Sequence, residues 1–499
     1  MEMMLAHEQR FELPSLKTSE RDMTTLPDNS NKRDTAARQP LKPGLPIADL
    51  APDDLAGIYA HPSQQRAVHR VAELIDWLRR CESPAELYEF QRHLFQDVYE
   101  ADNRRAACVR IVKRLRDGKQ LPADAPPPPP RGDPTTVECW EFEVFLYERL
   151  VRQFRAVGDA LAWFAFGCNR RAIVALSCNP SPGPLVKRAD DESYGGLPYE
   201  LGCVEEFWND RGHFTLLHDL TNCLRIADLT EFDEAGKGWL HEVKANPSRK
   251  RSAQTIRMQE AIDSIMGDGH LPGQSDDKQY VVLAEHYVTN LDQLARAMDL
   301  ARKHGSRGMQ LNQGRALIAS SPFDLMRRCG ADHKKGIEIM AAARRSALRR
   351  AGIESATHHV SGRSGDLAAR SPIAVPWGIY PLSPSDCAGL ICDYIVFETV
   401  VSVDALAASL SQVGLAVEVA LPNGNSGLDS SIDVFWITGR NRRLKVHGPS
   451  VTPLLFELLE PDSWVRGIAE LMSLPTVPGG PVLLFTDEAA SWAPAALAA

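Results

Sequence analysis

The sequence predicts an α/β protein of several domains, with an N-terminal helical region and a C-terminal α/β domain. A chain of 499 residues is too long for one ordinary hydrophobic core, so two or three domains are expected. The apolar content of 44% is typical of a globular protein. Helical periodicity dominates the first part of the chain, whereas strand-like runs alternate with helices in the rest.

The N-terminal part divides into three segments. Residues 1–45 are polar and rich in Pro, Ser, Thr and Asn, so we expect a disordered or loosely attached segment. Residues 46–120 have the periodicity of a helical domain. One apolar stripe in that segment comprises Val68, Val71, Leu74, Ile75 and Leu78. The stretch LPADAPPPPPRGDP at 121–134 predicts a stiff polyproline linker and the clearest domain boundary.

Three further segments complete the chain. Residues 135–330 are expected to run as a helix, a meander of three strands, a helix, a strand, a helix and a strand. Residues 331–374 predict a basic helix followed by a Ser/Gly/His-rich linker. Residues 375–499 alternate strand-like and helical runs, which predicts the C-terminal α/β domain.

Charge and cysteine usage narrow the classes of function. The formal charge of −9 argues against nucleic-acid binding by bulk attraction, so any polyanion site must be a local basic patch. The ten cysteines include no CxxC pair, which favours a reduced, cytoplasmic protein over a disulfide framework or a zinc ribbon. We expect no membrane association, because the sequence has neither an apolar signal core nor a stretch of transmembrane length.

The stretch CLRIADLTEFDEAGKGWLHEVKA contains the residues that say most about a possible catalytic site. Its segment DEAGKG has the glycines of a hairpin loop between two strand-like runs. If the loop is centred near Ala235, Asp228 and Glu242 face each other across the hairpin. Opposed residues of an antiparallel pair have Cβ atoms roughly 4.5–5.5 Å apart and point to one face. Lys244, two residues after Glu242, shares that face.

Two carboxylates at that separation repel each other unless a cation lies between them. We therefore expect Asp228 and Glu242 to hold a hard divalent cation such as Mg²⁺, with the main-chain carbonyl of Val243 as a further ligand. A water bound to such a metal is unusually acidic, and Lys244 could orient or deprotonate it. This set of residues suits the metal-assisted cleavage of a phosphodiester. The alternative is a surface hairpin with a cross-strand Glu–Lys pair.

These residues resemble the PD-(D/E)XK, or restriction-endonuclease-like, nuclease superfamily. Asp228, the hairpin and the Glu242-Val243-Lys244 strand match its motif, and a helix with Gln254 follows as in the superfamily. The resemblance covers roughly residues 137–320. It implies a mixed-sheet core flanked by helices and a Mg²⁺ cofactor for which Mn²⁺ can substitute. It also implies that Gln254 steadies the site or the phosphate.

The sequence departs from the superfamily at one position and leaves others open. Ala227 stands where many members have a proline before the aspartate. Asp219 is an alternative metal ligand to Asp228. The supporting acid of the first core helix has four candidates, namely Glu143, Glu148, Glu205 and Glu206.

Two basic groups are candidates for phosphate contact. Arg249, Lys250, Arg251 and Arg257 surround the start of the helix after the motif, where cations oppose the helix macrodipole. We expect this group to bind nucleic acid. The second group comprises Arg344, Arg345, Arg349 and Arg350, for which backbone contact and a solvated face are equally supported.

We therefore predict a Mg²⁺-dependent nuclease, with an endonuclease acting on DNA favoured over RNA by the resemblance. The chain has no GxxxxGK[ST] motif, so any motor would be a separate protein. A self-contained nuclease with extra domains resembles restriction or phage-defence effectors, acting as a homo-oligomer or with partner subunits of a defence complex. Two alternatives remain open: a catalytically degenerate nuclease fold that binds nucleic acid or serves as a scaffold, and a protein-interaction module.

Overall fold

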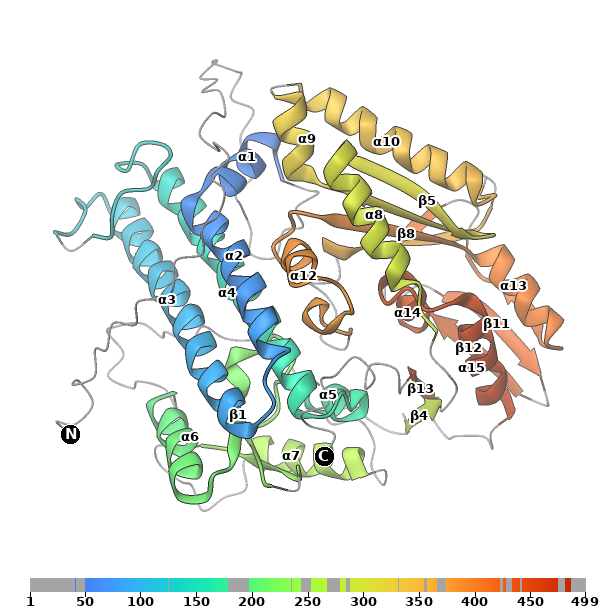
Figure 1. Cartoon of the computed structure of the whole chain (residues 1–499), viewed down its shortest axis with the longest axis horizontal. Helices are drawn as coiled ribbons and strands as arrows, with labels where there is room; N and C mark the ends of the chain where they lie inside the picture. The colour runs from blue at the N-terminus through green and yellow to red at the C-terminus, as the bar shows by residue number, and fades with distance from the viewer. Residues whose placement is uncertain are drawn as a thin grey trace.

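A computed structural model gives the fold of the chain (Figure 1). It describes residues 41, 50–123, 125–177, 197–234, 236–243, 253–266, 279–283, 288–330, 332–353, 357–365, 374–421, 425–427, 433–439, 442–473 and 481–485. Helices and strands are mixed along the chain, so the predicted α/β class is confirmed at that level. No helix within these ranges is both long and apolar enough to cross a membrane.

Four long or medium helices form the N-terminal part of the protein. They are α1 (Pro52–Ala60), α2 (Pro62–Leu78), α3 (Pro84–Arg116) and α4 (Val137–Ala165). A proline begins each of the first three, where its missing N–H leaves no intrahelical bond unmade. Of the predicted apolar stripe on α2, four residues are buried and Val68 is partly buried against the same core.

The proline-rich stretch connects two helices that share one core. The indole Nε1 of Trp140 donates to the carbonyl of Pro134 at 2.7 Å, and Arg104 donates to the carbonyl of Pro127 at 2.8 Å. Leu94 of α3 and Leu150 of α4 belong to the same buried cluster. Packing therefore crosses the boundary predicted at 121–134, and the division of the chain into domains stays a prediction.

A small antiparallel sheet follows, with strand order β1-β2-β3. The elements of this region are α5 (Arg170–Leu176), α6 (Leu197–Arg211), β1 (Phe214–Leu217), η2 (His218–Leu220), β2 (Leu229–Phe232), β3 (Gly238–His241), α7 (Ala253–Met266) and β4 (Gln279–Leu283). Their order from α6 is the predicted helix, three strands, helix and strand. The strand β4, however, pairs in parallel with β13 (Pro481–Phe485) in a separate two-stranded sheet. A mixed sheet that joins β4 to the meander is absent from the described pairings.

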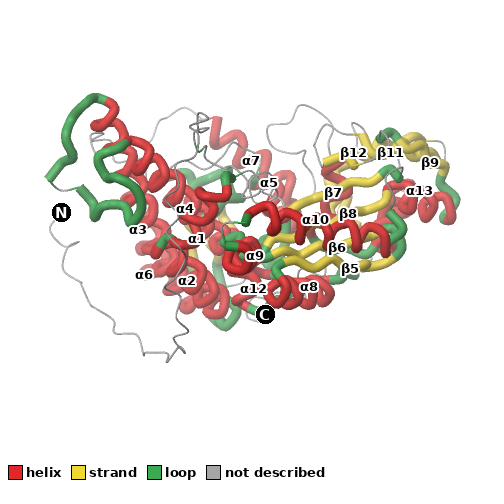
Figure 2. The backbone as a smooth tube through the Cα atoms, turned by 90° about the horizontal axis from the view of Figure 1, so that it is seen from above, coloured by secondary structure: helices red, strands yellow, loops and turns green. Residues whose placement is uncertain are grey.

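The largest sheet has five strands in the order β10-β7-β8-β6-β5. They are β5 (Ser306–Asn312), β6 (Arg315–Ser320), β7 (His359–Arg363), β8 (Val396–Ser402) and β10 (Asn425–Gly427). Successive residues of β6 pack on opposite faces of the sheet. Ile318 joins the apolar cluster beneath α10 (His333–Arg350), whereas Leu317 joins the main core with α8 (Leu291–His304). Figure 2 shows α10 lying over these strands.

This sheet corrects the predicted linker at the end of segment 331–374. The stretch contains β7, whose sequence HVSGR lacks the apolar run that identifies a strand. Its burial comes from its place between β10 and β8, which leaves Val360 only 1% exposed. The sheet also takes β5 and β6 from before residue 330 and β8 from after residue 374, so it spans both predicted boundaries.

A second antiparallel sheet has the order β12-β11-β9. The remaining elements are α9 (Pro322–Cys329), η3 (Trp377–Ile379), α12 (Pro384–Ile391), α13 (Val403–Gln412), β9 (Ala416–Val419), β11 (Asp433–Gly439), β12 (Arg442–His447), η4 (Gly448–Val451), α14 (Thr452–Phe456) and α15 (Pro461–Ser473). Arg79, just after α2, donates to the carbonyls of Gly378 and Leu382. The N-terminal helices are thereby joined to the C-terminal part of the chain.

Candidate active site

The β2–β3 hairpin has the register predicted from the sequence. Leu229 lies opposite His241, and Glu231 lies opposite Trp239. Asp228 and Glu242 are the next residues outward on the two strands, at the open end of the hairpin. The N–H of Asp228 donates to the carbonyl of His241 at 2.9 Å, which ties the two strands together at that end. The structure therefore places the two predicted metal ligands next to the paired ends of β2 and β3, each one residue outside its strand.

The chain reaches Asp228 through an unusual backbone conformation. Ala227 has a φ of +66°, in the left-handed region that residues with a Cβ seldom adopt. Strand β2 consequently begins only at Leu229, so Asp228 precedes the strand instead of lying inside it. The prediction placed Asp228 within one continuous strand, and the turn at Ala227 is the reason for the difference.

A buried histidine holds this turn. The Nδ1–H of His218 donates to the carbonyl of Ala227 at 3.1 Å, and Nε2 accepts from the hydroxyl of Thr230 at 2.7 Å. Burial lowers the pKa of His218 to about 3, so the ring stays neutral and keeps this tautomer. The N–H of His218 also donates to the carbonyl of Asp228 at 3.0 Å.

Each of the two carboxylates has a defined neighbour. Asp228 Oδ2 accepts the N–H of Val243 at 2.7 Å, so it reaches across to the partner strand. Glu242 Oε2 accepts the hydroxyl of Thr255 at 3.1 Å, which connects the hairpin to the first turn of α7. Asp228, Glu242 and Val243 are all half-buried, which leaves this end of the hairpin accessible from solvent.

Several predicted site residues fall outside the described residues. These are Lys244, Arg249, Lys250 and Arg251. Gln254 belongs to α7, but only its backbone lies within the described part of the chain. Arg257 is half-buried on the same helix. The predicted roles of these side chains as catalytic or phosphate-binding groups therefore stay predictions.

The alternative ligand Asp219 lies among arginines. Burial lowers the pKa of Arg155 and of Arg225, and in both cases the nearby carboxylate of Asp219 opposes the shift. Asp219 thus acts as a counter-charge for two buried guanidinium groups at the end of β1. Its neighbours favour Asp228 over Asp219 as the metal ligand, because cations beside a carboxylate compete with a metal ion.

The four candidates for the supporting acid lie on two helices. On α4, Glu143 is buried and contacts Nε2 of His61 at 3.2 Å, and burial raises the pKa of Glu148. On α6, the helix directly before β1, Glu205 and Glu206 are exposed. No contact in the described part of the chain joins any of the four to Asp228, so the choice stays open.

The hairpin also carries a charged cluster that the sequence reasoning missed. Glu231 is 3% exposed, and its Oε1 accepts from Arg211 at 2.9 Å and contacts Nδ1 of His213 at 2.7 Å. Its Oε2 contacts Nε2 of His241 at 2.9 Å. Burial alone would raise the pKa of Glu231, but the hydrogen bonds from His213 and Arg211 outweigh it and lower the pKa. Strand alternation could have predicted the contact between Glu231 and His241, because the hairpin register places both side chains on one face.

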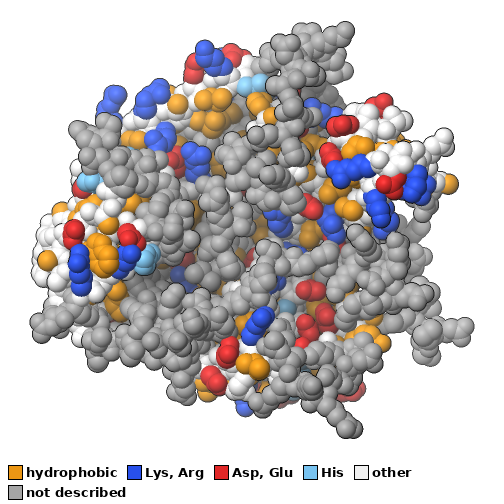
Figure 3. Space-filling view, turned by 180° about the vertical axis from the view of Figure 1, so that it is seen from behind, with side chains coloured by type: hydrophobic (Ala, Val, Ile, Leu, Met, Phe, Trp, Pro, Cys, Tyr) orange, Lys and Arg blue, Asp and Glu red, His pale blue; other side chains and the backbone are white. Residues whose placement is uncertain are grey.

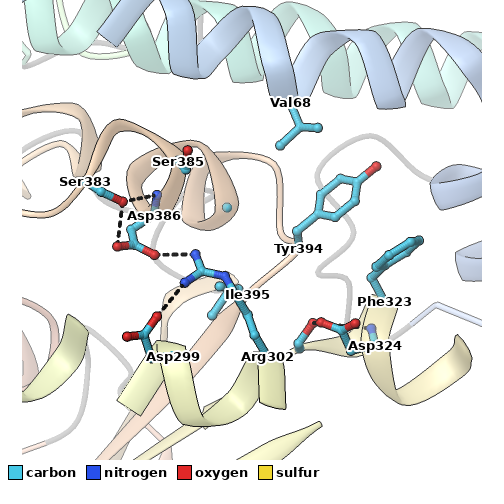
Figure 4. A pocket seen from close by; sticks show the side chains of 12 residues that line it. Val68, Asp299, Arg302, Phe323, Asp324, Ser383, Ser385, Asp386, Tyr394 and Ile395 are labelled. Atoms are coloured by element: carbon cyan, nitrogen blue, oxygen red, sulfur yellow. Dashed lines mark hydrogen bonds and ion pairs between the residues drawn. The ribbon is translucent and has the colours of Figure 1, made fainter. Parts of the chain in front are cut away.

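A separate cavity of about 490 Å³ lies between α2, α8, α9 and α12 (Figure 4). Its charged groups are used by the protein itself. Arg302 pairs with Asp386 and, at 3.3 Å, with Asp299, while the hydroxyl of Ser383 donates to Asp386 at 2.7 Å. Ser383 is the N-cap of α12, and the carboxylate of Asp386 accepts from its hydroxyl, so these contacts stabilise the start of that helix. Arg302, Asp299 and Asp386 are therefore already paired with one another.

The donors at the hairpin are oxygen atoms alone. Within the described residues, no group of three His, Cys, Asp and Glu side chains is placed to hold a metal ion. The predicted ligand set is smaller, because it consists of two carboxylates and one main-chain carbonyl. Such donors suit Mg²⁺, which fills its remaining positions with water and substrate phosphate.

Comparison with known proteins identifies no relative of the chain. No family model, no curated protein and no solved structure matches it.

Proposed function

We propose that this protein is a metal-dependent nuclease whose reaction centre lies at the open end of the β2–β3 hairpin. The observation that carries the proposal is the hairpin register, which leaves Asp228 just before β2 and Glu242 just after β3 at the same end of the hairpin. The hydrogen bond from Val243 to Asp228 and the one from Thr255 to Glu242 orient both carboxylates. Oriented carboxylates at a solvent-accessible strand end are what a phosphodiester-cleaving Mg²⁺ site requires.

Each residue of the proposed centre has a separate task. Asp228 and Glu242 would hold Mg²⁺ through carboxylate oxygens, and Val243 would add its carbonyl. The metal would supply an acidic water and offset negative charge on the phosphate. Lys244 would position or deprotonate the attacking water, and Gln254 would steady the phosphate. His218 acts through the turn at Ala227, because it holds the backbone from which the Asp228 side chain projects.

DNA is the proposed substrate, with RNA as the weaker choice, because the arrangement resembles the PD-(D/E)XK nucleases. Restriction or phage defence is the proposed setting, with a homo-oligomer or partner subunits as the proposed assembly.

A second function has a specific observation in its favour. The strand β4 pairs with β13 and not with the meander, and one oxygen of each carboxylate already accepts a hydrogen bond. A nuclease-like fold that no longer catalyses its reaction would tolerate both features. The chain would then bind nucleic acid or serve as a scaffold without cleaving it.

The test is an assay of the purified protein on duplex DNA, single-stranded DNA and RNA, with Mg²⁺ or with EDTA. The proposal expects Mg²⁺-dependent cleavage that EDTA abolishes, with DNA as the better substrate. Binding of DNA without cleavage under any metal would support the second function. A protein that neither binds nor cleaves any of the three would overturn both.

A further inference from the structure

The helix α10 carries an unusual concentration of positive charge for an acidic protein. Its residues His333–Arg350 contain six Lys and Arg side chains and one carboxylate, in a chain whose formal charge is −9. Figure 3 shows Lys and Arg side chains gathered over the part of the surface that α10 occupies. Four exposed cations of the helix form what we call the α10 stripe: Lys334, Lys335, Arg345 and Arg349.

Within the described residues, no carboxylate neutralises the cations of the α10 stripe. Some exposed arginines elsewhere form ion pairs, such as Arg80 with Asp76 at 3.0 Å and Arg92 with Glu89 at 3.2 Å. None of the four stripe residues makes an ion pair within the described part of the chain. Unpaired cations on one surface raise its positive potential, which attracts polyanions.

The helix polarity makes this placement unfavourable for the isolated protein. Lys334 and Lys335 lie in the first turn of α10, which contains no acidic side chain after the N-cap Asp332. Cations at a helix N-terminus oppose the macrodipole, at roughly 0.3–1 kcal/mol each. A bound anion would reverse that interaction, because it is attracted both by the lysines and by the helix end. The C-terminal arginines, by contrast, are in a favourable position without any ligand.

The inner face of α10 is held rigidly on the five-stranded sheet. A Cβ at Gly308 of β5 would lie 2.3 Å from the carbonyl oxygen of Ala343, so only glycine permits this close approach. Nε of Arg344 lies 3.1 Å from both carboxylate oxygens of Glu398, and Arg350 donates to the carbonyl of Gly308. The sheet therefore presents the stripe from a fixed support.

The geometry of the stripe fits an extended row of phosphates. Lys334, Arg345 and Arg349 lie on one side of the helix, because they are eleven and then four residues apart at about 100° per residue. The stripe spans about 22 Å at roughly 1.5 Å per residue. Along one strand of duplex DNA, phosphates recur at roughly 3.4 Å of axial rise, so several lie within reach.

Membrane binding is the less suitable alternative. An interfacial helix turns a broad apolar face outward, toward the acyl chains. In α10, Ala343, Ala347 and Leu348 instead pack in the cluster between the helix and the sheet, and Ile337 is the one large apolar side chain exposed among its described residues. A cationic outer face with one apolar side chain suits the backbone of a nucleic acid better than a lipid surface.

We infer that the α10 stripe binds the phosphate backbone of duplex DNA without regard to sequence. The stripe lies at the opposite end of the molecule from β1 and α7, which flank the proposed centre (Figure 1). It therefore captures DNA away from the hairpin and does not position the scissile phosphate. This inference deepens the proposed nuclease function and rests on it for the identity of the polyanion.

The experiment measures binding of a labelled DNA duplex in EDTA, so that cleavage plays no part. The stripe variant carries Lys334→Gln, Lys335→Gln, Arg345→Gln and Arg349→Gln. The matched control removes four exposed cations from α3 and its end, namely Arg92→Gln, Arg110→Gln, Lys113→Gln and Lys119→Gln. Both variants change the net charge by the same amount, and circular dichroism confirms that both are folded.

We expect the stripe variant to bind at least about tenfold more weakly than the wild type at about 50 mM salt, and the control to bind like the wild type. The slope of log K against log salt should fall by about 0.9 for each phosphate that the variant no longer neutralises, so by about 3 to 4. Equal weakening in both variants would overturn the inference, because bulk charge would then explain the binding. So would wild-type protein that binds no DNA, whether or not it binds anionic vesicles.

The experiment distinguishes failure of the stripe to bind DNA from failure of the proposed nuclease activity. DNA binding that depends on the stripe, without any cleavage in Mg²⁺, would reject the nuclease and keep the stripe. Cleavage by the stripe variant with unchanged DNA affinity would reject the stripe and keep the nuclease. If the nuclease proposal and the stripe inference are both correct, the stripe variant should cleave at the wild-type rate once DNA is saturating. The reason is that the stripe contributes to DNA binding and not to the chemical step.

Discussion

The Nδ1–H of His218 donates to the carbonyl of Ala227, the residue whose left-handed backbone turns the chain into Asp228. The same ring accepts a hydrogen bond from Thr230 on β2, two residues beyond Asp228. One buried imidazole thus links the end of β1 to both sides of the proposed metal ligand. Positioning of Asp228 and stability of the hairpin should therefore depend on His218.

Replacement of His218 should destabilise the protein, and the loss should be larger when both hydrogen bonds of the ring are removed than when one is kept. His218→Ala leaves a buried carbonyl and a buried hydroxyl without a partner and creates a cavity, so we expect the free energy of unfolding to fall by about 2–4 kcal/mol. His218→Asn keeps a donor for Ala227 and should be less harmful. Urea unfolding measures both, with His304→Ala at the exposed end of α8 as the control. Equal, small effects of all three changes would show that the ring does not hold the turn.

Stability should also depend on pH through this histidine. Its pKa is about 3 in the folded protein, below the ordinary value of 6.5, because burial disfavours the charged ring. The unfolded chain therefore binds a proton between these pH values that the folded protein does not. This contribution to the free energy of unfolding is complete above about pH 6.5 and falls by about 1.4 kcal/mol per pH unit below it.

The pH effect is isolated by comparing the wild type with His218→Asn, which does not titrate at this position. The wild type should be the more stable protein at neutral pH, and the difference should shrink steadily as the pH falls toward the folded-state pKa of about 3. Urea midpoints measured at several pH values give the comparison. A difference that stays constant over this range would mean that His218 titrates normally.

The left-handed conformation of Ala227 gives a prediction in which glycine is tolerated and valine is not. Glycine adopts a φ of +66° without a steric penalty, so Ala227→Gly should change stability by under about 1 kcal/mol. Ala227→Val should destabilise by about 2 kcal/mol or more, because a β-branched side chain is strained there. The same pair at Ala295, inside α8, should show glycine as the more harmful change. Thermal unfolding of the four variants tests this reversal.

Local patterns were enough to predict the hairpin and the helices around it. The two glycines of DEAGKG and the apolar runs beside it define a loop centre, and a loop centre sets the register of an antiparallel pair. The apolar stripe of α2 predicted buried residues in the same way, since helical periodicity depends only on local geometry.

These local patterns could not predict which strands distant in the sequence pair with each other. The strand β4 pairs with β13, which lies far later in the chain, and nothing in either apolar run specifies its partner. The strand β7, which lies between β10 and β8, has a largely polar sequence, so its burial comes from its neighbours and could not be predicted from its own residues. The turn at Ala227 could not be predicted from its local sequence either, because it is held by a hydrogen bond from His218, which belongs to a different element.

The most direct test of the account compares cleavage by Asp228→Asn with cleavage by Asp210→Asn. Both changes remove one carboxylate from an Asp, but Asp210 is exposed on α6 and has no task in the proposed centre. The measurement is the single-turnover rate on plasmid DNA in Mg²⁺, with DNA affinity in EDTA measured alongside. The account predicts that Asp228→Asn cleaves about 100-fold more slowly or worse and keeps its affinity, while Asp210→Asn matches the wild type. Cleavage by Asp228→Asn at the wild-type rate would contradict it.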